Sequence, residues 1–149
     1  MKIPLLLMLL IPSIAFGNKL IMGGLSHHFD GVFDTRYKFN EKHKGIGLEH
    51  NNFEVGAYNN SVNKTSYFIA YIDRPWQFKG GLCAGYRFGL ASGYEKIKWI
   101  NSEGDEITTD FIKGGIFPQA QFLISHESKY ITVDLGLSVV STLIFKINI

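Results

Sequence analysis

Two side chains in the first half of the sequence, His28 and Ser61, have the chemistry that acyl transfer requires. An imidazole beside a serine hydroxyl can accept its proton while the hydroxyl attacks or positions a carbonyl group. His27 precedes His28, but consecutive residues of an extended strand point to opposite faces, so these two histidines cannot bind one metal ion. We therefore expect a site with neither a metal nor a cofactor.

The elements that must position these side chains are strands. Apolar residues alternate with period two along most of the chain, and helical periodicity is missing. The pattern predicts an all-β fold, an eight-stranded antiparallel up-and-down transmembrane β-barrel. The expected strands cover residues 20–29, 45–49, 53–60, 67–73, 82–90, 116–125, 131–137 and 142–149.

One face of these strands is apolar, and the other combines glycine with isolated charges. A surface in water should be rich in Lys, Glu and Thr, whereas glycine leaves room in a crowded lumen where charges of both signs can pair. We therefore expect lipid outside and a polar, filled lumen. A soluble barrel with an apolar interior is the alternative. The charged residues expected inside are Glu49, Glu54, Arg87, Asp134 and Lys146.

The first strand decides where the histidine lies. Its alternation puts Ile21 and His27 on one face and Met22 and His28 on the other, which we expect to be the lumen. Antiparallel order then brings His28 to the same mouth of the barrel as Asn60 and Ser61.

The beginning of the chain resembles an export signal. Lys2 precedes an apolar run that ends in the small-x-small site Ala15-Phe16-Gly17. We expect residues 1–17 to be a cleaved signal peptide and residues 18–149 to form one domain. Cys83 is the only cysteine, so no intramolecular disulfide is expected. The formal net charge of +2 and the lack of a basic tract indicate no nucleic-acid partner.

Connection lengths indicate the orientation of the barrel. The two long connections, residues 30–43 and 91–114, fall at the same end. Outer-membrane barrels have long loops outside and short turns in the periplasm, so both termini should be periplasmic. The charged residues of 95–110 predict a solvated outside loop, in which Lys96 and Lys98 could contact lipopolysaccharide phosphates.

Short segments spread over the chain carry a family resemblance. They are residues 25–29 (LSHHF), 37–41 (YKFNE), 45–48 (GIGL), 57–64 (AYNNSVNK) and 115–118 (GIFP). In order and approximate spacing they resemble the PagP-like family of lipid A palmitoyltransferases.

The resemblance implies an outer-membrane barrel that moves a palmitoyl chain from phospholipid to lipid A. That family uses a histidine, an aspartate and a serine at the outer mouth; the histidine corresponds to His28 and the serine to Ser61. Asn60 stands at the aspartate position, where an amide keeps a hydrogen bond but lacks the charge. In that family, a gap in strand pairing admits lipid through the side of the barrel. Pro118 is consistent with such a gap, because proline cannot donate a hydrogen bond to the neighbouring strand.

Three functions remain open at this point. The first is an acyltransferase acting on lipid A, with His28 as base and Ser61 as nucleophile or oxyanion partner. The second is a non-catalytic outer-membrane barrel that modifies the cell surface through its outside loops. A small pore or a soluble ligand-binding barrel is the third. The expected partners are membrane lipids and lipopolysaccharide, and the protein is expected to be a monomer.

Overall fold

Antiparallel strands make up almost all of the computed structural model, which describes residues 18–28, 39–100, 104–110, 112–138 and 140–149. The predicted signal peptide and most of the expected connection 30–43 lie outside the described residues. Among the residues that are described, no helix is long and apolar enough to cross a membrane.

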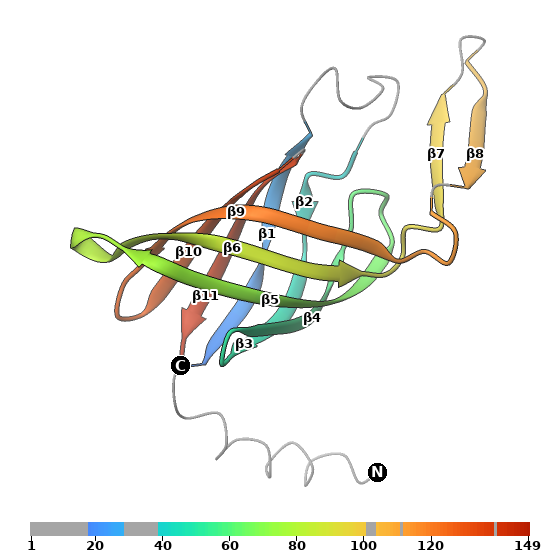
Figure 1. Ribbon diagram of the computed structural model, residues 1–149. Coiled ribbons are helices and arrows are strands. Elements are labelled where there is room, and N and C mark those ends of the chain that lie inside the picture. Colours follow the sequence, from blue (N-terminus) through green and yellow to red (C-terminus); the bar gives the residue numbers. More distant parts are fainter. Residues whose placement is uncertain (1–17, 29–38, 101–103, 111, 139) are drawn as a thin grey trace, which may run out of the picture.

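Eight strands form the closed barrel. Their bounds are β1 (Lys19–His28), β3 (Gly45–His50), β4 (Phe53–Asn59), β5 (Thr65–Gln77), β6 (Leu82–Ala91), β9 (Phe117–Glu127), β10 (Ile131–Leu137) and β11 (Val140–Asn148). Each strand pairs with its neighbours in chain order, and β11 pairs with β1 to close the ring (Figure 1). This arrangement confirms the predicted eight-stranded antiparallel barrel.

The two ends of the barrel differ. At the end that we call the turn rim, β3 and β4 are joined through Asn51 and Asn52, both with positive φ, the residue type that a two-residue hairpin turn favours. Asn18 and Ile149 also lie there, since the Ile149 amide donates to the Asn18 carbonyl. The opposite end, the loop rim, holds the end of β1 and the turn that follows β4.

Three short strands lie at the loop rim in addition to the eight strands of the barrel. Strand β2 (Lys42–His43) continues the line of β3 against β1. Strands β7 (Lys96–Ile100) and β8 (Glu106–Asp110) form a separate hairpin that stands apart from the barrel (Figure 1). Residues 95–110 were predicted as a solvated outside loop, and the two strands within it were not predicted, because five residues give too short an alternation to identify a strand.

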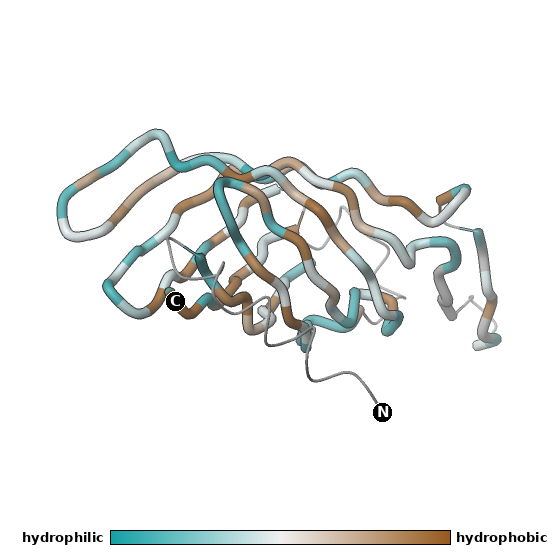
Figure 2. The backbone as a smooth tube through the Cα atoms, turned by 90° about the horizontal axis from the view of Figure 1, so that it is seen from below, coloured by the Kyte–Doolittle hydropathy of each residue, from teal (hydrophilic) through white to brown (hydrophobic). Residues whose placement is uncertain are grey.

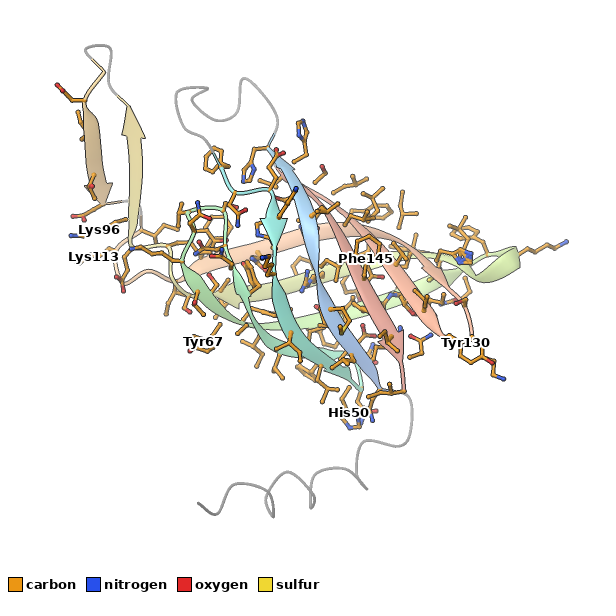
Figure 3. All side chains as sticks on the ribbon, turned by 180° about the vertical axis from the view of Figure 1, so that it is seen from behind. His50, Tyr67, Lys96, Lys113, Tyr130 and Phe145 are labelled. Atoms are coloured by element: carbon orange, nitrogen blue, oxygen red, sulfur yellow. The ribbon has the colours of Figure 1, made fainter. Side chains whose placement is uncertain are left out.

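Apolar side chains cover the outside of the barrel. Ile69 is 53% exposed, and its cross-strand neighbours Val55 and Leu90 are 46% and 49% exposed. Tyr67 and Tyr130 point away from the wall (Figure 3). Along the strands the chain alternates between hydrophobic and hydrophilic residues (Figure 2). The predicted inner charges are all buried, as expected; they are Glu49, Glu54, Arg87, Asp134 and Lys146.

A bulge in β1 changes the expected faces of that strand. Ile21 is buried and Met22 is exposed, the reverse of the prediction, whereas His28 lies on the lumen side as predicted. The register against β11 shifts between Ile21 and Gly24, and Gly23 has a φ of 90°. The extra residue of a bulge inverts the alternation on one side of it, which a strict period of two does not anticipate.

Candidate functional site

The structure brings His28 and Ser61 together at the loop rim. His28 is the last residue of β1, and Ser61 follows β4 in a turn. The Nε2 atom of His28 lies 3.1 Å from the Oγ atom of Ser61. Phe39 stacks on the imidazole with a ring separation of 4.1 Å and an interplanar angle of 10°, which fixes the plane of the ring. His28 and Ser61 therefore lie at the same mouth of the barrel, as predicted.

Asn60 lies beside this pair, but its side chain is committed elsewhere. Its Nδ2 group donates to Ser66 Oγ at 2.9 Å and to the Gly93 carbonyl at 3.0 Å. Its Oδ1 atom accepts from the amides of Val62 at 3.0 Å and Lys64 at 2.9 Å. Both donors and both lone pairs of the amide are thus used, and no capacity is left to orient His28. Asn60 shapes the turn that presents Ser61.

Asn40 also holds this turn, although nothing in the sequence distinguishes it from the rest of the segment 37–41. Its backbone amide donates to the Ser61 carbonyl at 2.8 Å, and its Nδ2 group donates to the Asn60 carbonyl at 3.1 Å. These contacts tie the segment before β2 to the backbone of the candidate nucleophile. Loop-to-loop hydrogen bonds of this kind leave no periodic signal in a sequence.

Tyr94 is a second residue that sequence reasoning missed. It lies between β6 and β7, hydrogen bonds with Ser61, and has its hydroxyl 3.1 Å from the Tyr58 hydroxyl. Burial, with a smaller contribution from Tyr58, raises the pKa of Tyr94 well above its usual range, so the phenol stays protonated. A neutral hydroxyl beside Ser61 can donate a hydrogen bond to a developing oxyanion.

Below the pair, the loop-rim half of the lumen contains a cavity of about 300 Å³. Much of its wall is apolar, with Ile21, Phe68 and Ile144 among the lining residues. Ile21 and Phe68 also belong to the buried apolar cluster of the barrel. A hydrocarbon chain would meet mostly apolar side chains there, while its carboxyl end could reach the two rim residues, which line the same cavity.

The charges occupy the other half of the lumen. Lys146, whose side chain is 0% exposed, lies 2.6 Å from Glu49 and 2.5 Å from Glu54 and also pairs with Asp134. Arg87 pairs with Glu54 at 2.6 Å and is the charged residue that reaches the cavity. The charges expected in the lumen therefore lie in one paired network beneath the cavity.

Arg74 belongs to this network, although the expected strand 67–73 ended before it. Strand β5 continues past it to Gln77, and a register shift between Asp73 and Trp76 turns its side chain inward. Arg74 pairs with Glu49 and with Asp134, both at 2.8 Å.

The acidic trio of this network is the only group within the described residues with the spacing of a metal site. The ligand atoms of Glu49, Glu54 and Asp134 lie within 4.8 Å of one another. The ammonium group of Lys146 already contacts all three carboxylates and supplies the positive charge that a cation would bring. The trio is therefore a structural ion-pair site.

The barrel wall is incompletely paired next to the cavity. The ladder between β9 and β10 ends at Phe122 and Leu137, so residues 117–121 of β9 pair only with β6. Pro118 lies in this segment, opposite Leu90 of β6. The cavity lining includes residues on both sides of the unpaired stretch: Phe117, Pro118, Gln119, Ala120, Gln121, Ser138, Val140 and Thr142.

These features define a closed eight-stranded antiparallel barrel with a serine–histidine pair at one rim, above an apolar cavity that reaches an unpaired part of the wall. No family model matches the chain, and no curated protein matches it.

Proposed function

We propose that this protein is an outer-membrane enzyme of the PagP-like type, which transfers a fatty acyl chain from a phospholipid to lipid A. The observation that carries the proposal is the hydrogen bond between His28 and Ser61 at the mouth of an apolar cavity of about 300 Å³. An enzyme that acts on an acyl ester needs a nucleophile with its base, which react with the carbonyl group, and an apolar compartment that holds the acyl chain.

The surface of the barrel supports insertion in a membrane. Large apolar side chains are exposed on all eight barrel strands. Contiguous apolar surface of this kind is unusual on a soluble monomer. Paired charges fill the turn-rim half of the lumen instead, and buried charges inside an apolar outer wall are the arrangement of barrels in lipid. Asn18 and Ile149 lie at the turn rim with the short turns, which face the periplasm in such barrels, so the candidate site would face the outside of the cell.

In the proposed reaction His28 acts as the general base and Ser61 as the nucleophile. Ser61 Oγ bonds to the ester carbonyl carbon of the phospholipid while His28 Nε2 takes the hydroxyl proton. The ester C–O bond then breaks, and the leaving alkoxide of the lysophospholipid receives that proton. A hydroxyl of lipid A takes the acyl chain from Ser61 by the reverse sequence. Tyr94 donates a hydrogen bond to the oxyanion.

The unpaired stretch of β9 offers the acyl chain a route into the lumen. Residues 117–121 lack a partner on the β10 side, and the cavity reaches them. A chain entering from the surrounding lipid would pass through the wall there without breaking ladder hydrogen bonds. Its chemistry would then take place at the loop rim.

The direct test is an assay with purified, folded protein in mixed micelles of phospholipid with a radiolabelled acyl chain and lipid A. We expect labelled lipid A with the wild type. Ser61→Ala and His28→Gln should each lower the rate by about 10²-fold or more, because each removes one half of the nucleophile–base pair. Ser128→Ala, which removes an exposed hydroxyl at the turn rim, is the matched control. Equal rates in all four proteins would contradict the proposal.

The hairpin of β7 and β8 favours a second candidate function, binding at the cell surface. It extends beyond the barrel from the loop rim (Figure 1). Replacing residues 96–110 by a short Gly-Ser linker separates the two functions. Loss of cell-surface adhesion with unchanged acyl transfer would assign adhesion to the hairpin, and unchanged adhesion would remove this second candidate.

A further inference from the structure

A second histidine and a second serine face the same cavity, one rung below the rim. His43, the last residue of β2, has its Nε2 atom 2.7 Å from Ser26 Oγ. Ser26 lies two residues before His28 on the lumen side of β1, which corresponds to roughly 7 Å along a strand. Ser26 and His43 both line the cavity, so a ligand in it can reach them.

The hydrogen bonds of His43 fix which nitrogen is basic. Its Nδ1 atom lies 2.7 Å from the carbonyl oxygen of Asn59. A carbonyl oxygen can only accept, so Nδ1 carries the hydrogen. In the neutral imidazole, Nε2 then has the free lone pair and accepts the hydroxyl hydrogen of Ser26. Ser26 is thus placed as a nucleophile, His43 as its base, and the Asn59 carbonyl as the acceptor that orients the imidazole.

The surroundings keep this arrangement in place. The Ser26 amide donates to the Glu41 carbonyl at 2.9 Å, which ties β1 to the chain just before β2. The ring of Tyr58 meets that of His43 edge to face, with centroids 5.7 Å apart. Ser26 is only 8% exposed, so water has little access to it from the outer surface. Both side chains of the pair therefore have defined positions before any ligand binds.

We infer that Ser26, with His43 as its base, is a second covalent site that accepts an acyl group from fatty-acyl esters bound in the cavity. Ser26 Oγ bonds to the ester carbonyl carbon, and its proton passes to His43 Nε2. The ester C–O bond breaks, and the leaving alkoxide takes the proton from His43. Water or an acceptor hydroxyl cleaves the resulting serine ester by the same steps in reverse. The lipid identity of the donor rests on the proposed function, whereas the reactivity of Ser26 does not.

The test is covalent labelling of the whole folded protein in detergent micelles with an alkyl fluorophosphonate. In this reaction the serine oxygen bonds to phosphorus and fluoride leaves, with the hydroxyl proton taken by the base. Peptide mapping by mass spectrometry then distinguishes Ser26 from Ser61. We expect an adduct on Ser26 that is lost in Ser26→Ala and forms at least about 10²-fold more slowly in His43→Gln, because an amide cannot replace the imidazole as base.

Ser128→Ala is the control and should label like the wild type, and circular dichroism confirms that each variant is folded. The wild-type peptide map alone decides the question if a variant does not fold. An adduct confined to Ser61, no adduct at all, or labelling of Ser26 that does not depend on His43 would overturn the inference. Labelling of Ser26 together with unchanged lipid A would contradict the proposed function alone. Acyl transfer that requires Ser61, without labelling of Ser26, would contradict this inference alone.

Discussion

His28 and Ser61 lie 33 residues apart in the chain and meet at one rim of the barrel, with Nε2 and Oγ separated by 3.1 Å. Strand β1 carries the histidine, and the turn after β4 carries the serine. A neighbouring pair, Ser26 and His43, faces the same cavity at 2.7 Å.

Asn60→Asp should lower stability and should not raise acyl transfer. A carboxylate cannot donate to the Gly93 carbonyl or to Ser66, and its charged oxygen would face that carbonyl. Loss of these buried hydrogen bonds costs about 1–3 kcal/mol. Thermal unfolding and the micelle assay measure the two effects. Asn63→Asp, an exposed residue of the same turn, is the control. Faster transfer by Asn60→Asp would instead show that Asn60 is a weakened catalytic carboxylate.

Lys146→Met should strongly destabilise the barrel. It removes the ammonium group that contacts three buried carboxylates. Arg74 and Arg87 remain as partners, so the buried network is left with an excess of negative charge. Breaking a buried ion pair in this way costs about 3–5 kcal/mol. Denaturant unfolding in lipid vesicles gives the free energy. Lys129→Met, at the exposed turn rim, should change it by less than about 1 kcal/mol. Similar effects of the two substitutions would show that the buried network contributes little.

Ile69→Arg should destabilise the protein in vesicles if the apolar outer face contacts lipid. Ile69 lies between Val55 and Leu90, which are also exposed. An arginine on the lipid face costs about 2–4 kcal/mol at the bilayer midplane and much less near the interface. Thr65→Arg, at the loop-rim end of the same strand, should therefore have a small effect. A barrel that works in water would tolerate both substitutions equally.

Gly23→Ala should distort the site, whereas Gly80→Ala should be mild. Both glycines have positive φ, 90° and 74°. A Cβ at Gly23 would lie 2.5 Å from the His43 carbonyl oxygen, while nothing lies within 4 Å of one at Gly80. Alanine at positive φ costs roughly 1 kcal/mol or more in both cases, and only the first adds a clash with β2. The expected result is a larger loss of stability and transfer for Gly23→Ala. Equal losses would mean that the bulge does not control the site.

Period-two alternation was enough to predict the barrel strands and the buried charges. It also predicted that His28 and Ser61 share a mouth, because that depends only on strand order and side-chain parity. The exchange of Ile21 and Met22 was not predictable from this pattern, since a bulge inserts one residue without an apolar signal. Arg74 was missed for the same reason.

The role of Asn60 shows a different limit of the sequence. A family pattern can assign a position to a residue type, but the hydrogen bonds of a side chain depend on loops that have no periodicity. Asn60 bonds to Gly93, 33 residues away. Tyr94 reaches Ser61 from that same segment. Only the closed barrel brings these segments together.

Mass spectrometry of lipid A from Gram-negative cells that express this protein tests the central claim most directly. Cells with the wild type should contain lipid A with one additional acyl chain, and cells with Ser61→Ala or His28→Ala should lack it although the variants are folded in the outer membrane. Unchanged lipid A in cells that hold folded wild-type protein in the outer membrane would contradict the proposed acyl transfer.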